Sequence, residues 1–489
     1  MQSNHYILIL ICILLLGVFL RIYGLDTESI WLDEGISLRL AEADPAVATV
    51  ERALNNHPPL YFILLHYWTK AFGNSVFSAR MLSVLFGFLS MLLIYKTGCM
   101  LFDRKTGILS ALLLGISLFH IYYSQEIRMY SMVSFLALCS VYFFIRLLED
   151  KKPKAAIGYI VSTAFLLYIH YSGFLLILIQ NVYLVILILR HRNESALSFK
   201  NWLKYQLVLF ILYLPWLWIG IIRLTKIQSA SLWLSKPTAS VFSDSIMEYS
   251  GSIFLFIIFT VLLLYGIFRV IKNRMYLFLC LWFIIPIGIL FGISYISKPL
   301  YLTKYTIISS LAFYILIAVS IGSIKKRYIK VLAISAILVF SAINFRTYYT
   351  QINHIPWSIV TSYVEDKAKP GDILIFNDIL CYRHVFSRYF EREDVRAEVL
   401  PQALQSAQFI AVDDDSVEDL RKIAEGHKRI WIIISHTVDK NKLIESAFFN
   451  SYKLLYHKVY PVRSYYKNAT NDAAEIFLFE KRQRGQNEA

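Results

Sequence analysis

The sequence contains few charged residues, and its cysteines follow no ligand or disulfide pattern. Only 17% of the 489 residues are Asp, Glu, Lys or Arg, whereas 57% are hydrophobic. A chain this long and this apolar is not typical of a soluble protein and indicates a polytopic membrane protein. The five cysteines form no CxxC and no Cys/His ligand spacing, so the sequence predicts neither a zinc site nor a disulfide framework.

Basic residues outnumber acidic residues and give the chain a formal net charge of +15. The lysines and arginines lie in short clusters between apolar stretches, and they form no continuous basic face. This distribution excludes nucleic acid as the partner. The excess of positive charge in the cytoplasmic loops of membrane proteins explains it instead.

About eleven stretches approach the roughly 20 apolar residues that a membrane-spanning helix needs. Their approximate cores are residues 5–23, 77–100, 106–123, 131–148, 155–170, 173–190, 204–222, 252–271, 276–296, 304–321 and 329–347. The first stretch has no basic n-region and no small-residue cleavage site. We therefore expect an uncleaved transmembrane anchor there and not a signal peptide.

Every second connection between these stretches is rich in Lys and Arg. The basic residues concerned are Arg104 and Lys105; Lys151, Lys152 and Lys154; Arg190, Arg192, Lys200 and Lys204; Arg269, Lys272 and Arg274; and Lys325, Lys326, Arg327 and Lys330. The positive-inside rule places these connections, and with them the N-terminus, in the cytoplasm. The connections at 24–76, 124–130, 171–172, 223–251 and 297–303, and everything after about residue 350, are then expected on the outer side of the cytoplasmic membrane.

Composition changes near residue 350, which predicts a transmembrane domain at 1–350 and a soluble extracytoplasmic α/β domain at 351–489. In the outer loop 24–76, apolar residues recur at the spacing of short interfacial helices; these are Ile36, Leu40 and Ala43, and then Leu60, Leu64, Trp68 and Phe72. The second domain contains apolar runs of strand length and helical patterns between them. The runs are Ile373–Phe376, Phe409–Val412, Ile430–Ile434, Leu454–Tyr460 and Ile476–Phe479, and the helical patterns lie near 357–367, 416–425 and 438–449.

Two short motifs in the second domain have more than one interpretation. Asp413-Asp414-Asp415 follows a predicted strand, where it either binds a cation or caps the helix that starts near Ser416. Capping is the favoured interpretation, because Asp and Ser are common at helix N-termini. Asn468-Ala469-Thr470 matches a glycosylation sequon, which matters only in a host that has the machinery.

The first candidate site residues are Asp33 and Glu34, which lie in the polar loop directly after the first hydrophobic stretch. A carboxylate here can act as a general base toward an acceptor, or the loop can simply be acidic. His57 precedes Pro58-Pro59, which fix the backbone and suit either a rigid turn that presents the imidazole or a stiff entry to the following helix.

A second candidate cluster lies in the segment Tyr122–Tyr130, where Arg128 is suited to bind a phosphate and Glu126 can pair with it. Lys304 stands beside two tyrosines in an apolar region and is expected to bind an anion, whereas Arg80 is expected to be an ordinary snorkelling residue. The predicted phosphate- and substrate-binding residues are His57, Gln125, Glu126, Arg128, Tyr130, His170, Tyr171 and Lys304.

One carboxylate pair and several cations at one membrane depth suit a donor that has an anionic phosphate and a polyprenyl tail, because such a tail keeps the donor in the bilayer. The cations would stabilise the leaving phosphate, and a carboxylate would deprotonate the acceptor. This chemistry requires no cofactor. A divalent metal bound by Asp33, Glu34 and His57 stays open.

The motifs Asp33-Glu34, Asn56–Tyr61, Tyr122–Tyr130 and His170-Tyr171 together resemble the dolichyl-phosphate-mannose-protein mannosyltransferase-like superfamily. Within it, the chain is similar to the bacterial and archaeal glycosyltransferase 39/83 group, which includes the aminoarabinose transferases of lipid A. The resemblance covers about residues 1–350. It implies a GT-C fold and an inverting transfer of a sugar from a polyprenyl phosphate to a lipid, glycan or protein acceptor.

The resemblance also implies roles for particular residues. Asp33 matches the proposed catalytic base, Glu34 matches its partner, and Arg128 matches the arginine that faces the donor phosphate. His57 stands where the aminoarabinose transferases have a lysine, which argues against aminoarabinose and favours the protein mannosyltransferase pattern. The second domain lacks the repeats of the eukaryotic enzymes, so the acceptor stays open.

Two other functions are compatible with parts of the sequence. A transporter or flippase of a lipid-linked glycan predicts internal repeats and ionisable residues near the bilayer midplane. The sequence has no clear repeat, and its charges gather at one face, so the glycosyltransferase is the favoured prediction. The second domain could also recruit the acceptor while the membrane part serves as a scaffold.

Overall fold

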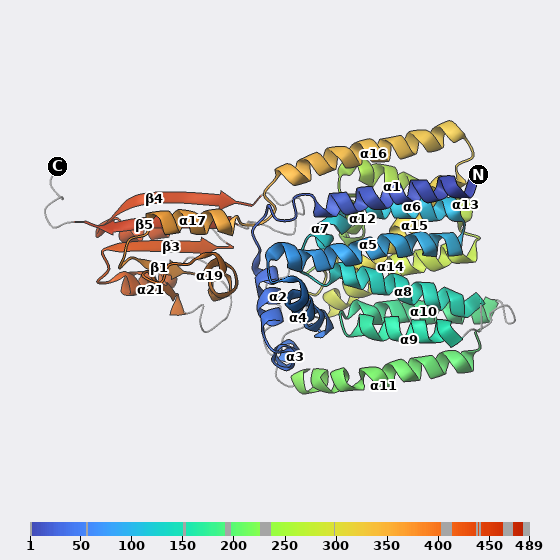
Figure 1. Cartoon of the computed structure of the whole chain (residues 1–489), viewed down its shortest axis with the longest axis horizontal. Helices are drawn as coiled ribbons and strands as arrows, with labels where there is room; N and C mark the ends of the chain where they lie inside the picture. Colours follow the sequence, from blue (N-terminus) through green and yellow to red (C-terminus); the bar gives the residue numbers. More distant parts are fainter. Residues whose placement is uncertain are drawn as a thin grey trace. The chain divides into compact units, whose positions relative to one another are not determined.

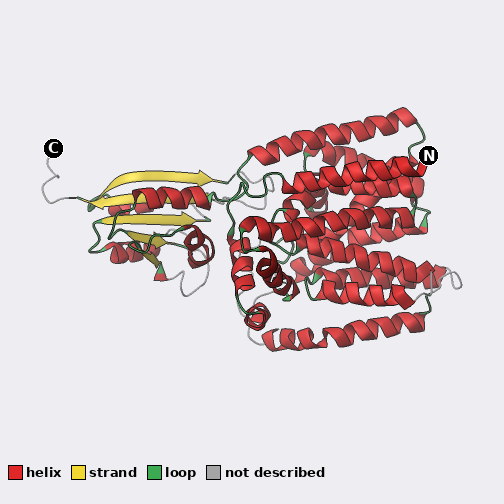
Figure 2. Ribbon diagram, in the orientation of Figure 1, coloured by secondary structure: helices red, strands yellow, loops and turns green. Residues whose placement is uncertain are grey.

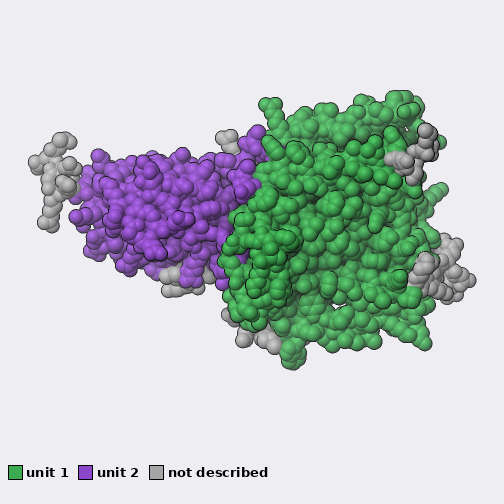
Figure 3. Space-filling model, in the orientation of Figure 1, with its two compact units in different colours: residues 1–25, 40–346 green, residues 26–39, 347–489 purple. Residues whose placement is uncertain are grey.

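The computed structural model describes residues 2–54, 57–149, 153–190, 197–224, 236–297, 299–401, 413–436, 439, 442–462 and 473–482. The chain divides into two units, which Figure 3 shows in different colours. Unit 1 comprises Met1–Leu25 and Leu40–Arg346, and unit 2 comprises Asp26–Arg39 and Thr347–Ala489. The loop segment that carries Asp33 and Glu34 therefore groups with the C-terminal part of the chain.

The described part of unit 1 is helical throughout (Figure 2). Its elements are α1 (Gln2–Ile22), α3 (Pro45–Leu54), α4 (Leu60–Phe72), α5 (Val76–Leu101), α6 (Arg104–Gly115), α7 (Leu118–Ser124), α8 (Tyr130–Glu149), α9 (Pro153–Leu167), α10 (Ser172–Arg190), α11 (Phe199–Leu224), α12 (Val241–Ser250), α13 (Ile253–Val270), α14 (Arg274–Ile296), η1 (Thr303–Thr306), α15 (Ile307–Ser323) and α16 (Arg327–Thr350), whose last turn enters unit 2. Helix α2 (Leu32–Glu42) begins in unit 2 and ends in unit 1. Helix α15 is the most buried of the long helices and packs against α6, α13 and α14.

The predicted polytopic membrane architecture is confirmed. Among the described residues, nine helices are long and apolar enough to cross a membrane, and the bent pair α6 and α7 makes a tenth if it is one span. The stretch expected at 155–170 forms α9, which has 15 residues and is shorter than the roughly 20 that a span requires. In Figure 1 the N-terminus lies at the end of the bundle opposite to α3 and α4.

The break between α6 and α7 bends the pair by 60° and interrupts the regular helical hydrogen bonding of the carbonyl groups at the end of α6. Arg21 is fully buried and donates to the carbonyl oxygens of Leu114 and Gly115, both at 3.1 Å. It also donates to the Ser124 hydroxyl at 3.2 Å. A buried cation in the bundle is thus used to satisfy backbone groups that lipid could not.

The described part of unit 2 beyond α16 is a mixed α/β domain. Its elements are α17 (Trp357–Lys367), β1 (Ile373–Phe376), α18 (Ile379–Cys381), η2 (Tyr382–Phe386), α19 (Ser387–Tyr389), β2 (Arg396–Val399), α21 (Asp414–Ala424), β3 (Arg429–Ser435), α22 (Leu443–Phe448), β4 (Tyr452–Pro461) and β5 (Ala473–Lys481). The strands form one sheet in the order β2-β1-β3-β5-β4. Strand β1 is parallel to β2 and β3, and β5 is antiparallel to β3 and β4.

Alternation along the strands divides their side chains between two faces of the sheet. Ile373 and Ile432 join the core cluster that α21 and α22 cover, whereas Trp431 meets Tyr363 of α17 with ring centroids 6.3 Å apart. Helices therefore cover both faces, as the sequence predicts for an α/β domain.

The predicted strands at 373–376, 430–434, 454–460 and 476–479 are confirmed, and so are the helices at 357–367, 416–425 and 438–449, with small shifts of their ends. The edge strand β2 escaped prediction, because its sequence Arg-Ala-Glu-Val carries little apolar signal. Asp413 and Ser416 form a capping box at the start of α21, which confirms the capping interpretation. The run Phe409–Val412 and the sequon Asn468-Ala469-Thr470 lie outside the described residues.

Candidate active site

The carboxylates of Asp33 and Glu34 lie in the first turn of α2. The positive end of the helix dipole favours negative charge at this position. Glu34 is completely buried, and its Oε2 accepts the backbone N–H of Trp31 at 3.4 Å. Asp33 is only partly buried, and its carbonyl oxygen accepts the Ser37 hydroxyl at 2.8 Å. Of the two carboxylates, Asp33 is therefore the more exposed, and Glu34 contributes a hydrogen bond at the start of the helix.

The segment before α2 is bound to the first residues of the C-terminal part of unit 2. The Glu28 carboxylate accepts the backbone N–H of Asn353 at 3.0 Å and its side-chain amide at 2.7 Å. The Trp31 ring stacks on the ring of His354. The hydroxyls of Ser29 and Ser358 are hydrogen-bonded at 2.8 Å. These contacts fix the backbone that leads to the two carboxylates.

A second set of contacts joins α2 to the helical stretch after β1. The backbone N–H of Ile30 donates to the Tyr389 hydroxyl at 3.0 Å. Gly35 lies so close to this stretch that a Cβ atom there would stand 2.2 Å from the carbonyl oxygen of His384. A side chain larger than hydrogen does not fit, which explains the glycine directly after the two acids.

Within unit 1, several of the predicted binding residues come together around His170. Its ring centroid lies 6.1 Å from those of His57 and Tyr130 and 5.7 Å from that of Tyr305. Lys304 places its Nζ 5.9 Å from the ring centroids of both Tyr130 and Tyr305. Four residues chosen from distant parts of the sequence therefore form one cluster.

Burial lowers the pKa of His170 to about 4, and the positive charges of Arg128 and Lys304 act in the same direction. The imidazole is therefore neutral at physiological pH. Its Nδ1 lies 3.1 Å from the backbone N–H of Ser172, which can only donate, so Nδ1 accepts and the proton lies on Nε2. Two cations and a neutral N–H donor are suited to an anionic ligand such as a phosphate.

The position of Lys304 is fixed by contacts between η1 and α12. The Thr303 hydroxyl donates to the Glu248 carboxylate at 2.9 Å, and the Tyr249 hydroxyl donates to the carbonyl oxygen of Thr306 at 2.9 Å. The Tyr301 and Ser245 hydroxyls are also hydrogen-bonded. Sequence analysis missed Glu248; the only signal available was an acidic residue next to Tyr249, just before the span predicted at 252–271.

The other predicted site residues have varied surroundings. The Gln125 amide donates to the carbonyl oxygens of Arg21 and Tyr23, at 3.1 and 2.9 Å, and so closes the C-terminal end of α1. Glu126 and Arg128 are both buried, and the backbone N–H of Arg128 donates to the Glu126 carbonyl oxygen at 2.8 Å. Tyr171 is 39% exposed.

The expectation that Arg80 snorkels toward the membrane surface is wrong. Its side chain is 3% exposed and donates to the carbonyl oxygen of Leu25 at 2.7 Å. Arg80 satisfies a backbone group just after α1, much as Arg21 does further inside the bundle. The position of Arg80 at a helix start could not reveal this, because the partner, Leu25, lies in the turn after another helix.

The described part of the chain has the fold of a polytopic helical membrane protein that carries an α/β domain. Residues 56–219 match the family described as dolichyl-phosphate-mannose-protein mannosyltransferase, which confirms the predicted resemblance for this segment. This matched segment contains His57, Arg128, Tyr130 and His170. No curated protein matches the sequence.

Three solved structures share the fold. The ArnT protein from Cupriavidus metallidurans in its apo state is 12% identical, with a TM-score of 0.62 over 98% of each chain. The same protein bound to undecaprenyl phosphate gives 12% identity and a TM-score of 0.61 over 97% of this chain and 98% of that one. The oligosaccharyltransferase AglB from Archaeoglobus fulgidus, in complex with an inhibitory peptide and a dolichol-phosphate, is 12% identical, with a TM-score of 0.57 over 100% of this chain and 75% of that one.

Proposed function

We propose that this protein is a glycosyltransferase that moves a sugar from a polyprenyl-phosphate donor to a lipid, glycan or protein acceptor, with inversion at the anomeric carbon. The observation that carries the proposal is the cluster of Lys304, Tyr130, neutral His170 and nearby Arg128 in the segment that matches the family, extended by η1. Support also comes from two proteins of the same fold whose structures contain undecaprenyl phosphate or dolichol-phosphate.

In the proposed reaction, Arg128 and Lys304 bind the donor phosphate and stabilise the negative charge that develops on it as the glycosidic C–O bond breaks. His170 donates its Nε2 proton as a hydrogen bond, and His57 lines the same cluster. A proton moves from the acceptor hydroxyl or amine to Asp33 as the new bond forms. Glu34 orients the helix start that carries this base.

The loop end that carries α3, α4 and η1 is proposed to face the outer side of the cytoplasmic membrane. The support is the distribution of Lys and Arg, which is concentrated in the connections on the opposite side of the helices. A polyprenyl donor would then present its phosphate at headgroup level, while its tail stays among the lipid-facing side chains.

The test is a transfer assay with membranes and a panel of radiolabelled polyprenyl-phosphate sugars. Wild type and the exposed control Asp26→Asn are expected to release polyprenyl phosphate, whereas Asp33→Asn binds the donor and releases none.

Lys304→Met is expected to weaken donor binding at least about tenfold, because charged hydrogen bonds contribute about 1.5–3 kcal/mol each. The exposed control Lys70→Met is expected to leave donor binding unchanged. Full release by Asp33→Asn contradicts the base assignment, and passage of unmodified lipid across the bilayer would favour the flippase.

A further inference from the structure

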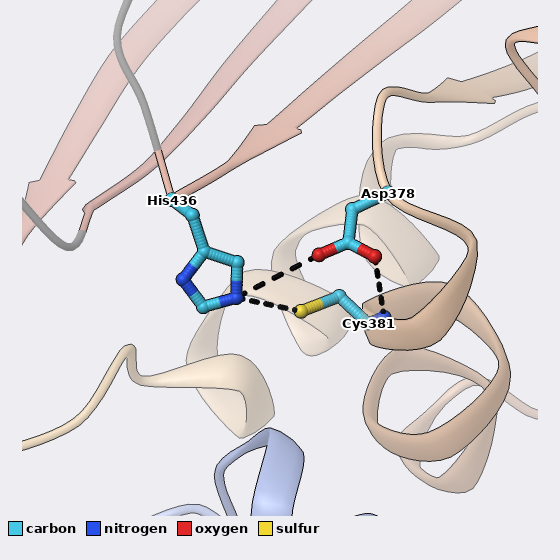
Figure 4. A group of neighbouring side chains, drawn as sticks. All are labelled: Asp378, Cys381 and His436. Carbon is cyan, nitrogen blue, oxygen red and sulfur yellow. Dashed lines mark hydrogen bonds and ion pairs between the residues drawn. The ribbon is translucent and has the colours of Figure 1, made fainter. Parts of the chain in front are cut away.

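Three side chains of types that bind transition metals converge in unit 2 (Figure 4). Asp378, Cys381 and His436 each place one donor atom within 4.8 Å of the other two. The Nε2 atom of His436 lies 3.2 Å from the Sγ atom of Cys381 and 3.6 Å from Oδ2 of Asp378. Asp378 and Cys381 are buried, whereas His436 is partly exposed.

The cluster stands at the carboxyl ends of two neighbouring parallel strands. Asp378 and Cys381 follow β1, and His436 directly follows β3. In the sheet, β2 lies on one side of the β1–β3 pair, and β4 and β5 lie on the other. The connection that leaves β1 therefore runs in the opposite direction across the sheet from the connection that leaves β3. Ligands of open α/β sheets bind at such a switch point.

Hydrogen bonds position the Asp378 carboxylate and join the strand ends beside the cluster. Oδ1 of Asp378 accepts the backbone N–H groups of Leu380 and Cys381, at 2.8 and 3.2 Å, which leaves Oδ2 on the side of His436. The Asn377 amide both donates to the carbonyl oxygen of Ser435 at 3.1 Å and accepts its N–H at 2.8 Å. This pair joins the ends of β1 and β3 next to the cluster.

The backbone of His436 has a φ of 61°, in the left-handed region that residues other than glycine rarely adopt. Such a conformation costs of the order of 1 kcal/mol or more and persists where its surroundings require it. Here it turns the chain directly after β3 so that the imidazole faces Asp378 and Cys381 (Figure 4).

The arrangement is not that of a catalytic triad. In a triad the carboxylate binds one ring nitrogen and the nucleophile binds the other. In this cluster the thiol and the carboxylate both approach Nε2. Donor atoms that all face one another suit a cation placed between them.

We propose that Asp378, Cys381 and His436 bind one Zn²⁺ ion, with a water molecule as the fourth ligand. Zinc takes nitrogen, sulfur and oxygen ligands in tetrahedral sites with bonds of about 2.0–2.3 Å, which sets ligand atoms about 3.3–3.6 Å apart. The distances of 3.2 and 3.6 Å from Nε2 are close to these values. The sequence did not predict this site, because Cys381 and His436 are far apart in the chain and come together only in the folded sheet.

The ion has a structural role. Cys381 is the last residue of α18, with which the helical stretch begins that continues through η2 to α19. The same stretch supplies the His384 and Tyr389 contacts to Gly35 and Ile30. A metal bound by residues after β3 and at the start of this stretch would stabilise the stretch, which the beginning of α2 contacts. This role does not depend on the sugar-transfer reaction.

The test measures zinc bound to the purified full-length protein after chelation, reconstitution with ZnCl₂ and dialysis. Wild type is expected to retain one zinc per chain, and Cys381→Ser and His436→Gln are expected to retain less than about a tenth as much. The matched controls Cys12→Ser and His457→Gln are expected to retain one zinc. His457 lies on β4, and its imidazole is hydrogen-bonded to Glu475 on β5. Zinc is also expected to raise the unfolding temperature of wild type by at least about 3 °C and that of Cys381→Ser not at all.

Cobalt binding to the wild-type protein provides a readout that needs no variant. A thiolate-to-cobalt charge-transfer band that zinc removes is expected, since Cys381 is the proposed sulfur ligand. Absence of zinc and of this band in folded wild-type protein would overturn the proposal. So would equal zinc content in wild type and in the folded Cys381→Ser and His436→Gln variants.

Discussion

The indole ring of Trp31 stacks on the imidazole of His354, with ring centroids 5.3 Å apart and planes inclined by only 4°. The two residues lie at opposite ends of the sequence that forms the helical bundle, yet both belong to unit 2. Their contact is part of a set that joins the segment with Asp33 and Glu34 to the C-terminal part of the chain. The C-terminal part of unit 2 therefore contacts the segment that carries the proposed base.

The Trp31–His354 stack is predicted to couple the two segments. Aromatic pairs of this kind contribute about 0.5–1.5 kcal/mol beyond the area that they bury. We expect Trp31→Ala and His354→Ala each to lower the free energy of unfolding, and the double variant to cost less than the sum by about that amount. A double-mutant cycle on thermal unfolding in detergent measures the coupling. Fully additive effects would show that the stack contributes nothing specific, and Trp31→Phe serves as the control that keeps an aromatic ring.

Gly35→Ala is predicted to displace the start of α2. The new methyl group would lie 2.2 Å from the His384 carbonyl oxygen, so the backbone must shift, at about 1–3 kcal/mol. We expect sugar transfer to fall at least about tenfold while donor binding is kept. The control is Gly292→Ala in α14, where no atom outside the helix's own nearby backbone and the adjoining residues lies within 4 Å of the added carbon. Equal activity of the two variants would contradict the tight fit at Gly35.

Stability is predicted to depend on pH through His170. Its pKa is about 4 in the folded protein, below the ordinary value of 6.5, so the unfolded chain binds the proton more readily. The folded state keeps its full stability above about pH 6.5 and loses roughly 3 kcal/mol as pH falls through 4. Thermal unfolding between pH 4 and 7 measures this loss. His170→Gln, which cannot titrate, is expected to flatten the profile; an unchanged slope would assign the loss to other groups.

Arg21→Met is predicted to destabilise the bundle. The change removes the buried donors that satisfy the carbonyl oxygens of Leu114 and Gly115 at the break between α6 and α7. Because hydrogen bonds to charged groups contribute about 1.5–3 kcal/mol each, we expect a loss of more than about 3 kcal/mol, read from the unfolding temperature in detergent. Arg190→Met, at the exposed end of α10, is the control and should change it little. Equal unfolding temperatures would mean that these carbonyls find other donors.

Much of the fold could be predicted because its signals are local. Helices such as α5 and α8 are apolar over most of their length, and strand β3 contains the run Ile-Trp-Ile-Ile-Ile, so hydropathy alone located them. The capping of α21 by Asp413 depends on residues three positions apart and was equally visible. Strand β2 lacked such a signal, because a short edge strand needs few apolar side chains.

The candidate site could be predicted only in part. The sequence singled out His57, Arg128, His170 and Lys304. Of these, His57 has a ring contact with His170, and both His170 and Lys304 contact the ring of Tyr130. The part of Glu248 in fixing η1, and the capping of α1 by Gln125, could not be foreseen, since both depend on which helix lies opposite.

The sequence by itself determined that this chain crosses the membrane many times, ends in an α/β domain and carries acids and cations between its helices. These properties follow from composition and periodicity, which act over a few turns of chain. Only the tertiary structure decided that residues 26–39 pack with residues 353–389, that His170 is neutral, and that Asp378, Cys381 and His436 converge. Those outcomes depend on burial and on contacts between segments far apart in sequence, and no local pattern specifies them.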